Sequence, residues 1–373
     1  KLLAVIAVFA MVACALVAFA PAADAADEPA PVLVKDNKEL FDALKDGAAS
    51  IQLTANISTA TEFPITEDTV IDLNGKKITN TANTSSDSGA VFDISNGAVV
   101  TIKNGEMINT AGIRGNGYAI IVDGQETPGV GLTLDNVTIT SNNYGVYVAG
   151  GASTENAAIL TVTNSTIDSL GTASAVSTNG LNGNESISIT GSKLSSVGGA
   201  AVYSPANAEW TIVDTDLTGI TGIDMRAGDI TVTGGSITFN TSATNDSNTS
   251  VSAGSGPLGL GVAISVLDAN NYAKGSQISI AVDGVDMVNK KGDASINYDV
   301  LVSAFAYTSL SGTDTVGGLF TNAGNTTSPI SVSYDGIEVE YAASEPATAA
   351  AIEFTTDSNN KPVVNVTAGQ NSN

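Results

Sequence analysis

The chain has 373 residues, of which 38 are acidic and 14 are basic, and it contains no His, so its net charge is −24. The absence of His excludes a Ser-His-Asp or Cys-His catalytic centre and a zinc site of His and Cys. Because Cys14 is the single Cys, an internal disulfide is also excluded. The acidic balance also argues against binding to nucleic acid, and against membrane contact by the mature chain beyond an anchor of unknown kind.

The first 25 residues have the pattern of a secretory signal peptide. Lys1 precedes an apolar run over 2–20, and the small residues of PAADA then suit cleavage after Ala25. We therefore expect a signal peptide at 1–25 and a mature chain that is secreted or held at the cell surface. The alternative is a retained anchor, because the apolar run is near the minimum length that spans a bilayer.

The next segment, 26–50, is expected to hold a short lead and a capping helix. Residues 36–46 place Leu40, Phe41 and Leu44 on one side of such a helix. A helix here would cover the open end of an apolar repeat structure, which otherwise exposes unpaired strand groups.

One pattern then recurs between 51 and 342, at intervals of roughly 20 to 32 residues. Each copy has alternating apolar residues, then Asn, Asp or Gly, then a second short alternating run. Alternation buries one face of a strand. The copies are VIDLNGKKIT (70–79), VVTIKNGEMI (99–108), LTLDNVTIT (132–140), LTVTNSTID (160–168), ISITGSKLSS (187–196), WTIVDTDLTG (210–219) and ITVTGGSITF (230–239), with looser copies at 278–288 and 330–340. A third strand signal lies between copies, and no interval contains a clear amphipathic helix.

Three short strands in each interval, with no helix, favour an all-β fold of the parallel β-helix type. One apolar residue in each copy is expected to point inward and to stack on its counterparts in the neighbouring copies. These residues are Leu73, Ile102, Leu134, Val162, Ile189, Ile212 and Val232.

The polar residues at the centre of each copy are expected to form corners. Asn104, Asn136, Asn164, Gly191, Asp214, Gly234 and Asp283 fall at or next to the same phase of the repeat. Asn, Asp and Gly share a tolerance of left-handed backbone conformations. Gly has no side chain to offer a metal, so we interpret the adjacent pair Asp135 and Asn136 as turn chemistry.

The lead and first copy resemble a known family. KDNKELFDALKDGAASIQLTANI (35–57), followed by VIDLNGKKIT, resembles the entry segment of pectate-lyase-like right-handed β-helix proteins. AVSTNG, AVYSPA and TGIDMRAGDITVTGGSIT resemble adhesin-like surface proteins of that group. The resemblance covers about 35–240 and weakens beyond it. It implies an all-β, right-handed, single-stranded parallel β-helix with three short sheets and an N-terminal capping helix. It says little about function, because this fold hosts lyases, hydrolases, tailspikes and adhesins.

Two stretches interrupt the repeat. Residues 241–257 are polar and low in complexity, and they indicate a loop that leaves the repeat. Residues 343–373 are expected to form a C-terminal cap, with two strands around an Asn-Asn-Lys-Pro turn.

The chemically richest stretch is 203–229. It holds the only Trp of the chain, Trp210, and one of its two Arg, Arg226. With Tyr203 and Asp224 these side chains form a candidate glycan-binding surface on the outer face, since stacking of repeats brings Tyr203 near Asp224 or Arg226. The alternative is that Trp210 packs in or against the core and that Arg226 pairs with a neighbouring Asp.

Asp214 and Asp216 are candidate metal ligands, because residues two apart on a strand share one face. Calcium is the only cofactor that this acidic, His-free composition favours, and it needs six or more oxygen ligands from several segments. No other cofactor is expected.

The function that fits these features is non-catalytic. We expect an adhesin-like β-helix, secreted or at the cell surface, that contacts an extracellular glycan or a surface protein. No catalytic residue is assigned. One alternative is a polysaccharide lyase or glycoside hydrolase of the same fold, and another is a structural envelope component.

Overall fold

The computed structural model describes residues 30–81, 89–110, 117–151, 158–178, 183–240, 262–268, 276–290, 300–306, 330–341, 350–359 and 362–367. The chain divides into two units, Lys1–Pro31 and Val32–Asn373, and every described helix and strand belongs to the second unit. The expected signal peptide at 1–25 and the expected loop at 241–257 lie outside the described residues.

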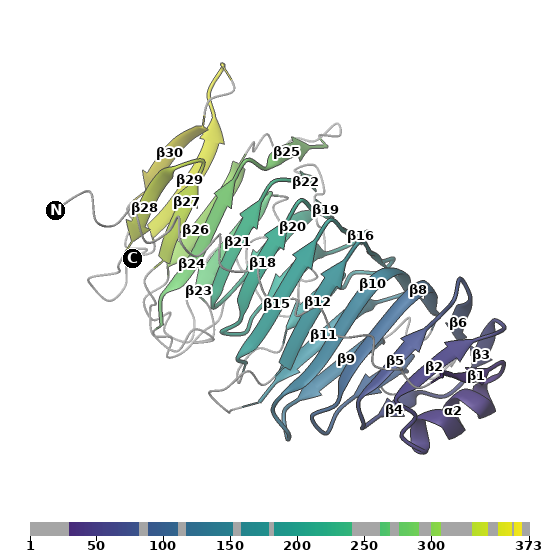
Figure 1. Ribbon diagram of the computed structural model, residues 1–373. Helices are drawn as coiled ribbons and strands as arrows, with labels where there is room; N and C mark the ends of the chain where they lie inside the picture. The colour runs from purple at the N-terminus through teal and green to yellow at the C-terminus, as the bar shows by residue number, and fades with distance from the viewer. Residues whose placement is uncertain are drawn as a thin grey trace, which may run out of the picture. The chain divides into compact units, whose positions relative to one another are not determined.

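The described residues are mostly β-strand, and the strands form three ladders (Figure 1). Ladder 1 contains β1 (Val32–Val34), β2 (Ser50–Leu53), β5 (Thr69–Asp72), the first parts of β8 (Val99–Asn109) and β10 (Val130–Ser141), β12 (Ala158–Thr163), β15 (Glu185–Thr190), β18 (Glu209–Val213), β21 (Asp229–Thr233), β24 (Ile278–Asp283), β27 (Ile330–Tyr334) and β28 (Ile337–Tyr341). Ladder 2 contains β3 (Ile57–Thr59), β6 (Lys77–Asn80), the second parts of β8 and β10, β13 (Thr166–Ser169), β16 (Lys193–Ser196), β19 (Asp216–Thr218), β22 (Ser236–Phe239) and β25 (Asp286–Asn289).

Ladder 3 is a separate sheet of 11 strands. It contains β4 (Phe63–Ile65), β7 (Phe92–Ile94), β9 (Tyr118–Gly124), β11 (Tyr144–Gly150), β14 (Val176–Thr178), β17 (Ala200–Ser204), β20 (Thr221–Met225), β23 (Ile264–Asp268), β26 (Val300–Ala306), β29 (Ala350–Thr356) and β30 (Pro362–Thr367).

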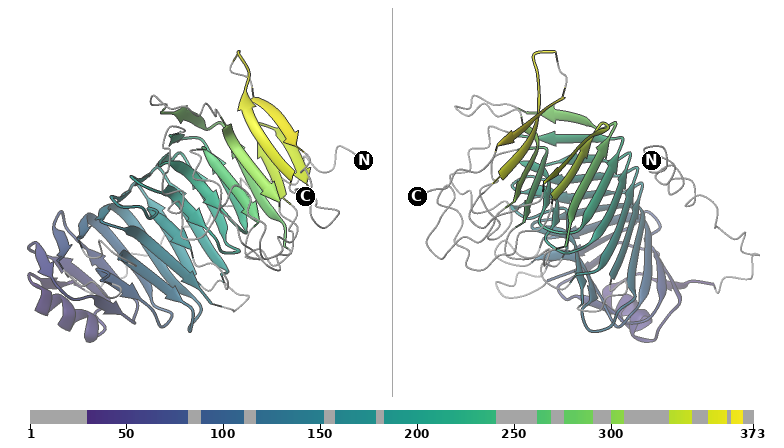
Figure 2. Two further views of the ribbon diagram at one scale, coloured as in Figure 1. Left: turned by 180° about the vertical axis from the view of Figure 1, so that it is seen from behind. Right: turned by 90° about the vertical axis from the view of Figure 1, so that its left-hand side faces the viewer.

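The chain visits the three ladders in a repeating order. Strands β12, β13 and β14 belong to ladders 1, 2 and 3, and the next three strands do the same. In these repeats each strand pairs in parallel with its counterpart in the next repeat, so strands of successive repeats lie side by side (Figure 2). This arrangement is an all-β fold built of parallel sheets.

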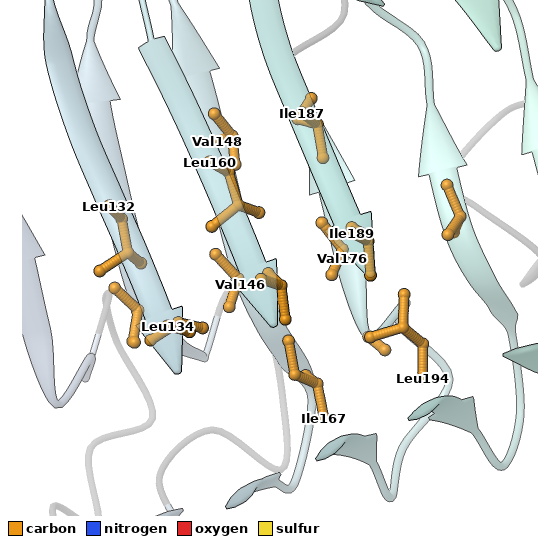
Figure 3. Close-up of a cluster of buried hydrophobic side chains, with 14 of the residues drawn as sticks. Leu132, Leu134, Val146, Val148, Leu160, Ile167, Val176, Ile187, Ile189 and Leu194 are labelled. Atoms are coloured by element: carbon orange, nitrogen blue, oxygen red, sulfur yellow. The ribbon is translucent and has the colours of Figure 1, made fainter. Parts of the chain in front are cut away.

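Inward-facing aliphatic side chains form the core, as the alternation predicts. Ile102 pairs with Leu134, and the column continues through Val162, Ile189, Ile212 and Val232, all of them buried. Residues from all three ladders, among them Leu134, Ile167 and Val146, belong to one core cluster (Figure 3). The predicted stack is therefore confirmed over these six residues.

The stack begins with a different residue from the one predicted. Ile71, not Leu73, pairs with Ile102. The turn after β5 is longer than the turns of later repeats, with left-handed backbone at both Asn74 and Gly75. Leu73 therefore follows the end of β5 and is not part of the strand column. Its side chain is still fully buried in the core.

Beyond Val232, two inward columns continue into the looser copies. Ile280 and Val332 pair with each other and follow Ile230, so they form a neighbouring inward column. The column of Val232 continues instead through Val282. Both columns face inward because side chains alternate along a strand with a period of two, so alternation alone does not choose between them.

The predicted corners have left-handed backbone, with one exception. Asn104, Asn136, Asn164, Gly191, Asp214 and Gly234 all have positive φ, between 46° and 64°. In the next repeat Gly284, not Asp283, takes this conformation, with φ of 62°. The corner side chains also contact one another, since Asn136 Nδ2 donates to Asn104 Oδ1 at 3.1 Å.

The helix predicted near the start is present as α2 (Asn37–Lys45). Its N-cap is Asp36, whose side chain accepts a hydrogen bond from the Glu39 backbone N at 2.9 Å. Leu40 and Leu44 are buried as expected, but Phe41 is 42% exposed. The buried face of α2 is therefore narrower than the sequence pattern indicates.

The last described strands pair in antiparallel fashion. β29 and β30 flank the predicted Asn-Asn-Lys-Pro turn and form the two expected strands. β27 still pairs in parallel with β24, but β28 pairs antiparallel with β27, so the copy at 330–340 ends in a hairpin and not in a second parallel strand. Its turn residues Asp335 and Gly336 both have positive φ, which is typical of a type I′ hairpin.

Candidate functional site

Trp210 lies in the core, as the alternative interpretation of the sequence has it, and not on the outer face. In ladder 1 it pairs with Ile187 and Ile230, and it is 1% exposed. Its indole Nε1 donates to Ser204 Oγ at 2.9 Å, which satisfies the one polar group of the buried ring. The strand alternation that turns Ile187 and Ile230 toward the core also turns Trp210 inward, so the ring has no face available to a sugar.

Asp224 and Arg226 form a buried ion pair. Both are 1% exposed, and Arg226 Nη2 lies 3.0 Å from the Asp224 carboxylate. Ser265 Oγ also donates to Asp224 Oδ1 at 3.3 Å. Tyr203 pairs with Asp224 across β17 and β20, as the predicted stacking of repeats requires. The alternative in which Arg226 pairs with a neighbouring Asp is therefore confirmed, and the candidate glycan-binding role of Asp224 and Arg226 on the outer face is corrected, because their charges are directed at each other and not at solvent.

The candidate metal ligands Asp214 and Asp216 have separate local roles. Asp214 is a left-handed corner residue, with φ of 46°. Asp216, at the start of β19, accepts a hydrogen bond from Ser236 Oγ at 2.7 Å. Among the described residues, no group of three or more His, Cys, Asp or Glu side chains is arranged to hold a metal ion.

A cluster of three tyrosines on ladder 3 was not singled out from the sequence. Tyr118 and Tyr144 are paired at the starts of β9 and β11, and Tyr147 follows on β11. The Tyr118 ring stacks on Tyr147 with centroids 4.6 Å apart and lies 4.9 Å from the Tyr144 ring. All three are partly exposed. We call Tyr118, Tyr144 and Tyr147 the tyrosine surface.

Carboxylates flank the tyrosine surface. On the outer row of ladder 3, Asp93 pairs with Ile121, which in turn pairs with Tyr147. Asp123 lies two residues beyond Ile121 on the same strand and so on the same face. Burial raises the pKa of Asp93, and the charge of Asp123 raises it further. Burial likewise raises the pKa of Tyr147 to about 12, with smaller effects from Tyr144, Glu185 and Asp123, in that order.

Glu62 extends this acidic row by one repeat. It precedes β4, and its Oε2 accepts a hydrogen bond from the Ala90 backbone N at 3.3 Å. Burial raises the pKa of Glu62, and the neighbouring charge of Asp93 adds to the effect. The row therefore offers hydrogen-bond acceptors beside the rings.

The tyrosine surface combines two kinds of contact. Ring faces and edges provide apolar area, the hydroxyls donate and accept hydrogen bonds, and the flanking carboxylates accept them. The sequence did carry a signal for it, because Tyr118 and Tyr144 are separated by about one repeat. Trp210 and Arg226 are scarcer residue types than Tyr, but the spacing of the tyrosines is the better guide to a shared surface.

Comparison with known proteins adds no assignment. No family model, no curated protein and no solved structure matches the chain. Within the part of the chain that the structure describes, no helix is both long and apolar enough to span a membrane.

Proposed function

We propose that the three ladders are the faces of one right-handed, single-stranded parallel β-helix of the pectate-lyase-like kind. The proposal is supported by the constant order in which the chain visits the ladders and by the single core cluster that their residues share. Its handedness follows the general rule for crossovers between parallel strands. An experimental structure with left-handed crossovers, or with the ladders in separate domains, would contradict it.

We further propose that this β-helix is a non-catalytic, adhesin-like protein, secreted or held at the cell surface, that contacts neutral glycans through the tyrosine surface. The observation that carries the proposal is the contiguous set of partly exposed rings at 118, 144 and 147 in a chain with only 5% aromatic residues. A pyranose ring has an apolar C–H face and a rim of hydroxyls, and these match ring faces flanked by carboxylates.

The charge around the rings favours neutral over acidic glycans. Asp93 and Asp123 lie on the outer face of the same ladder, and the chain as a whole carries a net charge of −24. A uronic acid placed here would meet like charges at short range, which costs binding free energy. Nucleic acid is disfavoured for the same reason.

A glycoside hydrolase is the second candidate, and one observation favours it. Asp93 and Asp123 are neighbouring carboxyls, and the raised pKa of Asp93 is the property of a general acid. A structural envelope component remains the third candidate, and it requires no ligand at the tyrosine surface.

Binding of soluble neutral polysaccharides, measured by calorimetry, tests the proposal. Tyr147→Ala should weaken binding by about tenfold, because a stacked ring contributes roughly 1–1.5 kcal/mol. Phe41→Ala is the matched control, since Phe41 is an exposed aromatic on α2. Equal affinities for both variants and the parent chain would contradict the proposal.

An assay for release of reducing ends separates the hydrolase. Activity that Asp93→Asn abolishes would favour catalysis. Saturable binding without release favours the adhesin-like function. Absence of both supports the structural component.

A further inference from the structure

Several corners of the repeat contain an Asn followed by a Gly. This dipeptide is chemically labile, because Gly has no Cβ to hinder attack of its own backbone N on the Asn side chain. The structure describes both residues of three such pairs, which are Asn74 with Gly75, Asn96 with Gly97, and Asn104 with Gly105. All three Asn have left-handed backbone, with φ between 49° and 59°. Backbone conformation therefore does not distinguish the three pairs, but hydrogen bonding does.

Asn74 is held by both its side chain and its backbone. Its backbone N donates to Asp72 Oδ1 at 2.8 Å, and its Nδ2 donates to Leu53 O at 3.1 Å. The group that would attack is also engaged, since Gly75 N donates to Asn104 O at 2.7 Å. A reaction at Asn74 therefore requires that the corner first open and break these bonds.

Asn104 is held in the column of corner side chains. Its Nδ2 donates to Asp72 Oδ1 at 3.3 Å, and its Oδ1 accepts from Asn136 Nδ2 at 3.1 Å. Gly105 lies within β8 and pairs with Val137 of the next repeat. The Asn104 side chain cannot turn toward Gly105 without losing both of its hydrogen bonds.

Asn96 has far weaker restraints at the corner between β7 and β8. It is exposed, and its Nδ2 makes one long hydrogen bond, to Thr66 O at 3.4 Å. Within the described residues, no group donates to Asn96 Oδ1 and none accepts from Gly97 N. The next repeat passes Gly97 with Thr127 and Pro128, so it stacks no Asn side chain on Asn96. The amide and the group that attacks it are both available.

We propose that Asn96 is a site of spontaneous deamidation in the folded protein, whereas the fold protects Asn74 and Asn104. Gly97 N bonds to Asn96 Cγ, the bond from Cγ to Nδ2 breaks, and ammonia leaves with the proton that Gly97 N loses. The product is a cyclic imide. Water then adds to either of its carbonyl carbons and opens the ring to aspartate or isoaspartate.

The modification changes both the charge and the backbone of this corner. It adds one carboxylate to a chain that already carries a net charge of −24. Isoaspartate also lengthens the main chain by one carbon where β7 leads into β8. The inference does not depend on glycan binding, because it follows from the hydrogen bonds of the three corners alone.

Incubation of the folded chain at mildly alkaline pH, followed by peptide mapping with mass spectrometry, tests the proposal. Base speeds the reaction because the attacking backbone N must lose its proton. Asn96 should react at least about tenfold faster than Asn74 or Asn104, since hydrogen bonds must break before either of those reacts. In the urea-unfolded chain the three rates should converge, because Gly follows Asn in each pair. Equal rates in the folded chain, or an order that persists unchanged in urea, would overturn the proposal.

One substitution tests the protection directly. Asp72→Ala removes the acceptor that Asn74 N and Asn104 Nδ2 share, so it should accelerate deamidation at both sites and leave the rate at Asn96 unchanged. No acceleration at Asn74 and Asn104 would contradict the protection assigned to them.

The matched control is Asp216→Ala. The Asp216 carboxylate also accepts a corner hydrogen bond from the next repeat, but its donor is Ser236 Oγ and not an Asn-Gly pair. This variant should change none of the three rates. An acceleration equal to that of Asp72→Ala would show that loss of any corner carboxylate loosens the repeat, and would overturn the specific role of these hydrogen bonds.

Discussion

Gly105 and Leu73 pack against each other at the first corner of the repeat. A Cβ added at Gly105 would stand 2.4 Å from the Leu73 Cβ and 2.5 Å from the Lys76 carbonyl oxygen. Gly105 pairs with the buried Val137 of the next repeat, so its position faces the core. Because Gly105 has no side chain, a space is left in the core at this corner. Leu73, from the longer turn of the preceding repeat, fills that space.

Gly105→Ala should lower the free energy of unfolding by about 1–3 kcal/mol, because the added methyl overlaps backbone as well as side chain. Gly131→Ala is the control, since its Cβ would meet Val99 Cγ1 at an ordinary 3.6 Å. Chemical denaturation measures both. Equal stability of the two variants would show that the first corner repacks freely.

The Asp224–Arg226 pair leads to a second prediction. Both groups are buried, and Arg226 Nε and Nη1 have no hydrogen-bond partner among the described residues. Arg226→Ala should cost about 3–5 kcal/mol of stability, because it removes the guanidinium that pairs with the buried Asp224 carboxylate. The double variant Asp224→Leu with Arg226→Met should recover most of that loss, since apolar replacements remove both desolvation costs. Thermal or chemical unfolding of the three proteins checks this, and a double variant less stable than Arg226→Ala would contradict it.

The sequence predicted the repeat well where one physical rule acted alone. Alternation placed Ile102, Leu134 and Val162 inward, and left-handed tolerance placed Asn136 at a corner, because each depends only on local backbone geometry. The predicted register was wrong at Leu73, because a longer turn after β5 shifts which residue of that repeat lies opposite Ile102. Such a shift depends on how two repeats pack, and a single repeat does not encode it.

The candidate site was predicted poorly for a related reason. Scarcity of a residue type does not say which face of a strand it occupies, and Trp210 and Arg226 proved to be buried. The tyrosine surface arises from pairing between β9 and β11, which puts Tyr118 beside Tyr144 although they are far apart in sequence. The parity of Trp210 within WTIVDTD, which it shares with the inward Ile212, was the available signal for its burial.

The acidic row on ladder 3 predicts a pH effect on stability. The pKa of Asp93 is raised by burial and then by Asp123, and that of Glu62 by burial and then by Asp93. A carboxyl with a raised pKa in the folded state stabilises the fold fully below its unfolded value, which is 3.8 for Asp, and this contribution is lost as pH rises through the folded value. The parent chain therefore loses this contribution as pH rises, whereas Asp93→Asn does not. The Tm of Asp93→Asn minus that of the parent chain should increase as pH rises from about 4 to 7.

The control for this effect is Glu126→Gln, since Glu126 is exposed. Its Tm difference from the parent chain should stay constant across the same range. Scanning calorimetry at several pH values measures both differences. A constant difference for Asp93→Asn as well would show that Asp93 does not carry the effect.

Trp210 gives the last prediction, and it separates a structural role from a binding role. The ring is buried between Ile187 and Ile230, so Trp210→Ala removes a large core side chain and should cost about 3–5 kcal/mol. Trp210→Phe keeps most of the apolar contact but loses the hydrogen bond from Nε1 to Ser204 Oγ, so it should cost less. Affinity for neutral glycans, expressed per folded molecule, should be unchanged in both variants because the ring presents no face to solvent. Chemical denaturation and calorimetric binding on the same preparations check the two statements independently. A loss of affinity in Trp210→Phe without a loss of stability would place Trp210 at a binding surface and contradict its role in the core.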